Sequence, residues 1–101
     1  MYTRNGGDTL TSTQLCTEAG ISYRQLDYWL RNGVIPSSYV TDTTGSGHHR
    51  QWDPDVIAPL RVIGQVSAAV QLSCAQYADI FVIHDHGSYE LAPGVTLTWT
   101  P

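Results

Sequence analysis

One short stretch of the chain, residues 20–36, combines arginines and tyrosines with the periodicity of a helix. Its apolar side chains Leu26, Trp29 and Leu30 share one side, and the polar side chains take the other. The polar set is Tyr23, Arg24, Asp27, Tyr28 and Arg31. Arginine binds phosphate or guanine through paired hydrogen bonds, and tyrosine hydroxyls also bind phosphate. We interpret this side as a candidate DNA-binding surface. The plainer alternative is a solvated helix face with an ion pair four residues apart.

A second group of donors, His48, His49 and Arg50, lies further along the chain. It follows a glycine-containing polar stretch that separates two β-compatible segments, 39–42 and 48–52. This pattern predicts a β-hairpin. A hairpin placed after two helices forms a wing, which can present its tip to a grooved surface. The two histidines are therefore best interpreted as wing residues near phosphate.

Other chemistry finds little support in the sequence. His84 and His86 flank Asp85 and suggest a metal site together with Cys74, but no further ligands stand at the spacing that a zinc site needs. No nucleophile–base pair, phosphate-binding loop or carboxylate pair is recognisable, so we expect neither an enzyme nor a cofactor. Cys16 and Cys74 are far apart in the sequence, and we expect two reduced, unpaired thiols.

Three helix starts position the candidate surface. Thr11 with Gln14, and Ser22 with Gln25, each form the pattern of a capping box, and Asp53 precedes a proline that suits the first helical position. Gly20 and Gly33 follow the first two apolar patterns as stop signals. The sequence therefore predicts helices at about 12–19 and 23–32 and a third helix from residue 54. The link between the first two is short enough to force a helix–turn–helix.

These segments together resemble the helix–turn–helix of MerR-type winged-helix proteins. The family typically has T-x-x-x-L, then G-V-S-x-R-T-L-R-Y-Y and G-L-L; here the corresponding runs are Thr11…Leu15, Gly20-Ile21-Ser22-Tyr23-Arg24-Gln25-Leu26-Asp27-Tyr28-Trp29 and Gly33-Val34-Ile35. The run Gly47-His48-His49-Arg50-Gln51-Trp52 followed by Asp55-Val56 is similar to the family's wing, G-Y-R-x-Y…D-V. The resemblance covers about residues 10–65.

The resemblance implies that Arg24 contacts DNA, that Tyr28 contacts the phosphate backbone and that Arg50 grips phosphate or the minor groove. Tyr23 would occupy the variable position at the helix tip, where base edges are usually read. The sequence departs from the family at Asp27, which replaces a frequent arginine, and at Trp29, which replaces the second tyrosine. His48-His49 replaces the usual Gly-Tyr before the wing arginine. The base preference of the family is therefore not transferable.

The second half of the chain departs from the long coiled-coil helix of MerR-type regulators. We expect one further helix from about residue 67, with Gly64 and Ser67 weakening its join to the third helix, and short strands at 80–84, 88–92 and 95–100. Val95, Leu97 and Trp99 alternate with threonines, so we expect them to lie against the helices. The predicted fold class is α+β: a winged helix–turn–helix with a C-terminal helix and a short β-hairpin or meander. Its parts would be a flexible start (1–9), the DNA-binding domain (10–66) and a C-terminal helix with strands (67–101) packed on that domain.

Charge and length limit the function further. The chain has 101 residues and a formal net charge of −4, which argues against indiscriminate coating of nucleic acid. All five basic residues are arginines and lie before residue 62, so one end can carry a local positive surface. The apolar runs are too short to span a membrane and no signal peptide is recognisable, so we expect a soluble, cytoplasmic protein. No heptad repeat follows the wing, and we expect a monomer in free solution.

The sequence thus predicts a double-stranded DNA-binding protein, first a transcriptional regulator. The compact form also resembles excisionases, the recombination directionality factors, and small phage or actinobacterial regulators. A protein-interaction module of the anti-repressor kind is the alternative from another class, favoured by the acidic net charge and by Asp27. Self-association on DNA, and a protein partner bound through the C-terminal strands, are further expectations.

Overall fold

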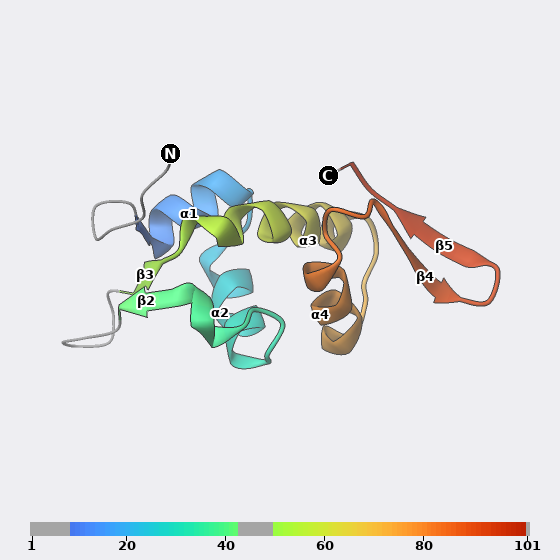
Figure 1. The fold of residues 1–101 in the computed structure, drawn as a ribbon, viewed down its shortest axis with the longest axis horizontal. Helices are drawn as coiled ribbons and strands as arrows, with labels where there is room; N and C mark the ends of the chain where they lie inside the picture. Colours follow the sequence, from blue (N-terminus) through green and yellow to red (C-terminus); the bar gives the residue numbers. More distant parts are fainter. Residues whose placement is uncertain (1–8, 43–49, 101) are drawn as a thin grey trace.

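The computed structural model describes residues 9–42 and 50–100 and has the predicted α+β fold (Figure 1). The helices are α1 (Ser12–Ala19), α2 (Tyr23–Arg31), α3 (Ile57–Ala69) and α4 (Cys74–Val82), and short 3-10 turns span Ser37–Tyr39 and Pro54–Val56. The strands are β1 (Leu10–Thr11), β2 (Val40–Asp42), β3 (Gln51–Trp52), β4 (Ser88–Ala92) and β5 (Val95–Thr98). Residues 1–8, 43–49 and 101 lie outside this description, and with them lie most of the expected flexible start and both wing histidines.

The helix–turn–helix forms as its capping residues predict. Thr11 Oγ1 accepts the Gln14 amide at 3.1 Å while Gln14 Oε1 accepts the Thr11 amide at 2.9 Å, and Ser22 and Gln25 repeat this exchange. Gly20 ends α1 with φ of 72°, in the left-handed region that glycine enters without strain. At the end of α2 the Val34 amide donates to the Trp29 carbonyl, which is a Schellman-type closure.

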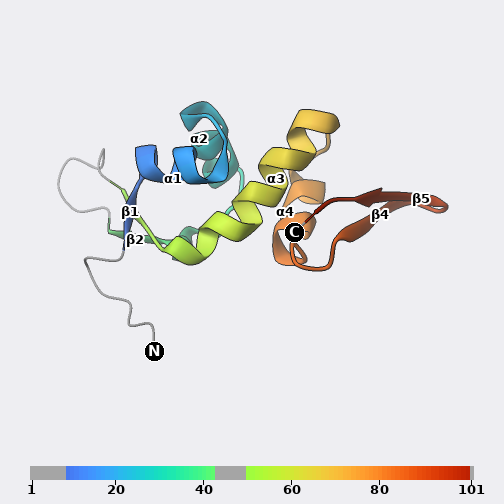
Figure 2. The same cartoon turned by 90° about the horizontal axis from the view of Figure 1, so that it is seen from above.

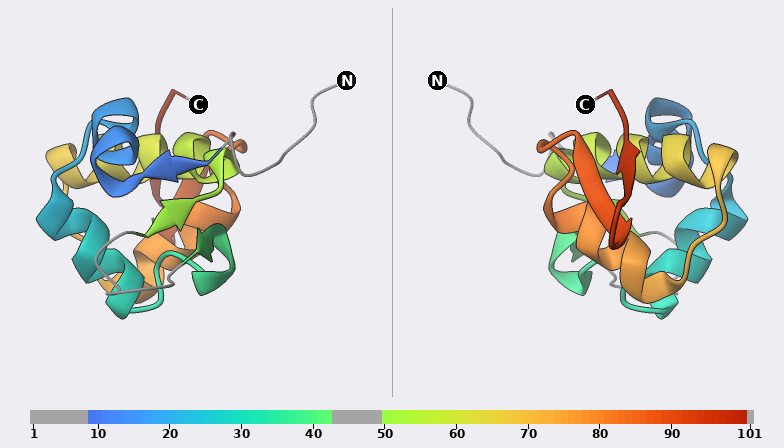
Figure 3. Two further views of the ribbon diagram at one scale, coloured as in Figure 1. Left: turned by 90° about the vertical axis from the view of Figure 1, so that its left-hand side faces the viewer. Right: turned by 90° about the vertical axis from the view of Figure 1, so that its right-hand side faces the viewer.

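A three-stranded sheet in the order β1-β3-β2 lies at one end of the molecule (Figure 3, left). The predicted wing pairing is confirmed, because Val40 of β2 pairs with Trp52 of β3 in antiparallel register. The first strand was not predicted: Leu10 pairs with Trp52 from the other side. Trp52 is fully buried and donates its indole N–H to Ser12 Oγ at 2.9 Å, so the root of the wing is fixed to the start of α1.

The prediction for the third and fourth helices was wrong in its boundaries. Helix α3 continues through Gly64 and Ser67 to Ala69, and α4 starts only at Cys74. Ser73 caps α4 with Gln76 in a third capping box, the same pattern that starts α1 and α2. The expected strand at 80–84 does not exist, because α4 runs through Ile80 and Phe81, which are buried on one side of the helix.

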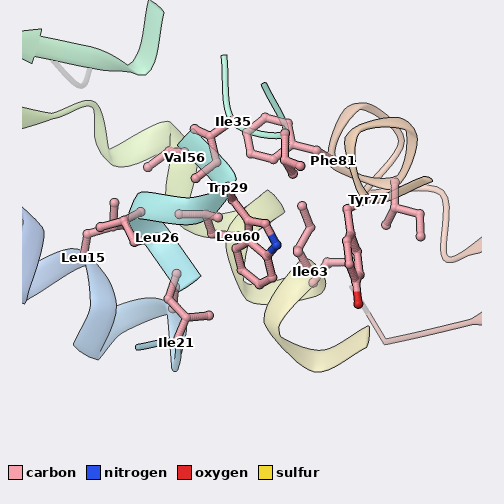
Figure 4. Packing of buried hydrophobic residues seen from close by; sticks show 14 of the residues in the cluster. Leu15, Ile21, Leu26, Trp29, Ile35, Val56, Leu60, Ile63, Tyr77 and Phe81 are labelled. Carbon is pink, nitrogen blue, oxygen red and sulfur yellow. The ribbon is translucent and has the colours of Figure 1, made fainter. Parts of the chain in front are cut away.

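The four helices share one core, drawn in Figure 4. Leu15, Leu26, Leu60, Ile63 and Ile80 are fully buried there. Two aromatic pairs join α4 to the first half of the chain: the rings of Trp29 and Tyr77 are 5.7 Å apart, and those of Tyr39 and Phe81 are 5.6 Å apart. Such pairs add to the stabilisation that apolar burial provides. Helix α4 is therefore part of the body that holds α2.

The β4–β5 hairpin extends from the body at the end opposite the wing (Figures 1 and 2). Its base is anchored, because Trp99 donates its indole N–H to the His84 carbonyl at 2.7 Å and Tyr89 donates its hydroxyl to Asp79 at 2.9 Å. The prediction that Val95 lies against the helices was wrong, since Val95 is 52% exposed next to the hairpin turn. Leu97 and Trp99 are partly buried and contact the core.

At Gly64 helix α3 lies close against the helix–turn–helix. A Cβ atom at this position would lie 2.7 Å from Ile21 Cγ2 and 3.5 Å from the Ala19 carbonyl oxygen. Glycine is ordinarily unfavourable inside a helix, by about 1 kcal/mol relative to alanine. Its presence here lets α3 pack directly on the turn that joins α1 to α2, and this contact sets the position of α2.

We expect Gly64→Ala to destabilise the protein despite alanine's better helix propensity. Overpacking in a filled core typically costs about 1–3 kcal/mol, so we expect a net loss of about 1 kcal/mol after the helix gain. Thermal unfolding measures this as a fall of several degrees in Tm. The double variant Gly64→Ala with Ile21→Leu is the control, because leucine lacks the Cγ2 methyl and should recover part of the loss. An unchanged or raised Tm for Gly64→Ala alone would contradict this packing.

Candidate nucleic-acid interface

Helix α2 presents the predicted polar side to solvent. Tyr23 is 56% and Tyr28 is 54% exposed, and Arg24 and Arg31 are also exposed, whereas Leu26 and Trp29 are buried on the opposite side. The buried stripe fixes the rotation of the helix about its axis, and the capping residue Ser22 fixes where the helix begins. The five predicted side chains of α2 thus belong to one surface, with Asp27 half-buried at its edge.

Arg24 differs from the other described arginines. Its side chain makes no hydrogen bond or ion pair with any residue in ranges 9–42 and 50–100, whereas Arg31 and Arg50 contact Asp27 and Arg61 contacts Glu18. It stands in the first turn of α2, where no acidic residue offsets its charge. A cation at a helix N-terminus opposes the helix dipole and is unfavourable by about 0.3–1 kcal/mol. Fold stability therefore does not explain this arginine.

Asp27 joins α2 to the root of the wing. Its Oδ2 lies 3.0 Å from Arg31 Nε and its Oδ1 lies 3.4 Å from Arg50 Nη1. The Asp27 and Arg50 side chains are only 22% and 24% exposed, while the Arg31 side chain is 75% exposed. One carboxylate thus holds two arginines that are far apart in the sequence, and the three side chains keep a net positive charge.

Tyr28 has a neighbour that sequence reasoning missed. The Cys74 thiol, at the start of α4, donates to the Tyr28 hydroxyl oxygen at 3.7 Å. The proximity of the Cys74 sulfur raises the pKa of Tyr28, mainly through the hydrogen bond between the two side chains, then through charge and, least, through burial. A tyrosine hydroxyl is protonated around neutral pH with or without this shift, so Tyr28 can donate a hydrogen bond there. The Ser73–Gln76 capping pattern was the available signal for placing Cys74 at a helix start.

The remaining predicted site residues divide into two groups. Arg50 lies at the root of the wing, directly before β3, and is brought next to the surface of α2 through Asp27. His48 and His49 fall outside the described residues.

Among the residues that the structure does describe, no group of three His, Cys, Asp or Glu side chains could hold a metal ion. Cys16 and Cys74 are both unpaired and half-buried, and burial raises the pKa of Cys16.

A cavity of about 460 Å³ lies between α3 and the end of the chain. Three of its charged or polar side chains make hydrogen bonds within the protein, and another, Asp85, is 74% exposed and lies 3.8 Å from His86 Nε2. Arg61 donates to the Glu18 carbonyl at 3.0 Å, the Gln65 side chain exchanges two hydrogen bonds with the Thr100 backbone, and His84 Nδ1 lies 3.0 Å from the Phe81 carbonyl. Among the described residues no buried side-chain nitrogen or oxygen lacks a hydrogen-bond partner, so the cavity holds no buried polar side chain that is left for a ligand.

Among the described helices, none combines the length and apolar character needed to cross a bilayer.

Comparison with known proteins found no match among curated sequences and none among solved structures. A family model does match: "MerR HTH family regulatory protein", over residues 10–81. The matched range includes the helix–turn–helix, the β1-β3-β2 sheet, α3 and nearly all of α4, while the β4–β5 hairpin lies beyond it. The match spans more than half of the chain, and its descriptive name agrees with the DNA-binding architecture, so this chain belongs to the MerR family of helix–turn–helix regulatory proteins.

Proposed function

We propose that this protein is a sequence-specific transcriptional regulator that binds double-stranded DNA by inserting α2 into the major groove. The observation that carries the proposal is the N-terminal end of α2, where Arg24 has no partner among the described residues and Tyr23 is exposed beside it. In helix–turn–helix proteins the N-terminal residues of the second helix contact base edges. An arginine there, unfavourable for the helix, is accounted for by guanine or phosphate as its partner.

The other residues are assigned by their place around this end. Tyr28 and Arg31, further along the exposed side of α2, would contact the phosphate backbone. Arg50 at the root of the wing, with His48 and His49 beyond it, would reach the flanking backbone or minor groove. Phosphate contacts of this kind fix the register of a protein on the duplex, while base contacts specify the sequence.

The acidic net charge does not oppose this assignment. Asp27, the acid on the presented side, is matched by two arginines and leaves a positive cluster. The acids after residue 62 include Asp79, Asp85 and Glu90, which belong to α4, the following turn and the hairpin. Pairing of Asp27 removes one of the two sequence arguments for an interaction module that lacks DNA binding.

Selection of bound sequences from random duplexes, followed by a salt titration on the selected site, tests the proposal. With roughly three to five phosphate contacts, log affinity should fall with log salt at a slope of about −3 to −5. Absence of both enrichment and salt-dependent binding would contradict the proposal and favour the interaction module. The arrangement of selected sites adds a second distinction: paired inverted half-sites support a regulator, whereas directly repeated sites support a recombination factor of the excisionase kind.

A further inference from the structure

Asp27 occupies a position where a DNA-binding surface would not ordinarily carry an acid. Its carboxylate is 22% exposed, and each of its oxygens faces a different guanidinium: Arg31 on α2 and Arg50 at the wing root. From the geometry we infer that Asp27 is a positioning residue. It holds Arg31 and Arg50 in place for phosphate without itself touching DNA. This inference rests on the proposed function.

The contacts leave both arginines able to bind a further acceptor. A guanidinium has five N–H donors, and the described contacts with Asp27 use one nitrogen of each arginine. The other nitrogens of these two guanidinium groups have no partner within ranges 9–42 and 50–100. An arginine already fixed on a carboxylate loses less conformational freedom when it then binds phosphate. One acid therefore lowers the entropic cost of two contacts and leaves the cluster net positive.

The burial of the Asp27–Arg50 pair supports a positioning role over an incidental surface ion pair. Both side chains are about three-quarters buried, so salt screens the pair less than it screens an exposed one. Arg50 directly precedes Trp52's strand, and Trp52 is fully buried. The backbone at the wing root is thus held by Trp52, and the Arg50 side chain is held by Asp27.

Asp27 also repels phosphate, and the experiment must separate this effect from positioning. Asp27→Asn is compared in the parent and in a background that lacks both arginines, Arg31→Ala with Arg50→Ala. In the parent we expect affinity for the selected duplex to fall about fivefold, because two arginines must then be ordered on binding. In the background without Arg31 and Arg50 only the repulsion between Asp27 and phosphate remains, so Asp27→Asn should leave DNA affinity unchanged or raise it. Asp85→Asn, with the same change of net charge in the turn after α4, serves as the control and should have little effect.

The effect of Asp27→Asn on the parent decides between positioning and simple repulsion. If Asp27→Asn strengthens DNA binding in the parent as much as in the background without Arg31 and Arg50, Asp27 only repels DNA and the inference is overturned. Raising the salt concentration adds a check, since screening removes the repulsion and should deepen the loss caused by Asp27→Asn relative to the parent at the same salt.

A measurement on the free protein keeps the inference testable even if the proposed function fails. In the nitrogen-15 relaxation spectrum of the arginine side chains, Asp27→Asn should increase the mobility of the Arg50 guanidinium. Arg61, which contacts Glu18 on α1, should keep its order and is the internal control. An Arg50 side chain that stays as rigid in Asp27→Asn as in the parent would overturn the positioning role without any reference to DNA.

Discussion

Trp52→Ala is expected to lower the Tm of the protein by more than about 10 °C. The indole is fully buried, lies in the central strand of the β1-β3-β2 sheet and donates to Ser12 Oγ at 2.9 Å. Truncating a buried tryptophan to alanine typically costs about 3–5 kcal/mol. A domain of this size has a total stability of about 5–15 kcal/mol, and a loss this large lowers Tm by more than about 10 °C. Circular dichroism during heating measures the change.

Trp52→Phe separates packing from the hydrogen bond. Phenylalanine keeps an aromatic ring in the core and loses the indole donor, so we expect a smaller destabilisation of about 1–2 kcal/mol. The alanine variant should also lose DNA binding, since the strand that carries the root of the wing is anchored by this residue. A Trp52→Ala protein that melts within a few degrees of the parent would show that the sheet contributes little to the fold.

Arg24→Glu is expected to abolish specific DNA binding while leaving the fold as stable as the parent, or slightly more stable. A bidentate arginine–guanine contact is worth about 1–3 kcal/mol, and the introduced acid adds repulsion from phosphate, so affinity should fall roughly a hundredfold or more. An acid in the first turn of α2 interacts favourably with the helix dipole, by about 0.3–1 kcal/mol. Competition binding on the selected site and thermal unfolding measure the two effects.

A fall in DNA affinity together with an unchanged or raised Tm would identify Arg24 as a functional residue. A misfolded variant would instead lose both DNA affinity and stability. Arg61→Glu on α3 is the charge-matched control and should reduce DNA affinity far less. Arg24→Lys resolves the kind of contact: lysine cannot form the paired hydrogen bonds of a guanidinium, so a base-reading Arg24 would lose preference at one base pair. Equal binding of the parent and Arg24→Glu to one duplex would show that α2 does not read DNA.

Local sequence patterns determined the helix–turn–helix. The Thr11–Gln14 and Ser22–Gln25 capping boxes fix where α1 and α2 begin, and Gly20 and Gly33 fix where they end, because these groups bond within a few residues of one another. The apolar spacing of α2 then determined which side is exposed. The predicted placement of its polar residues on one surface followed from these short-range interactions alone.

The error in α4 has a specific cause. The run at 80–82 is short and wholly apolar, and such a run fits a buried strand as well as a helix. The Ser73–Gln76 capping box upstream was the local signal that favours a helix, and Tyr77, Ile80 and Phe81 complete its buried side. Gly64 was misjudged for a related reason: local propensity treats it as a break, whereas the packing of α3 on Ile21 requires it.

Contacts between distant segments were decided only by the tertiary structure. A two-residue strand such as β1 has no local signal of its own and exists because Leu10 pairs with Trp52. The same holds for the Asp27–Arg50 contact and for the Cys74–Tyr28 contact, which join α2 to the wing and to α4. Side-chain types and spacing determined that α2 carries arginines and tyrosines on its exposed side. Packing determined that Asp27 also contacts Arg50 and that Arg24 has no partner among the described residues, because long-range pairing depends on how the whole core folds.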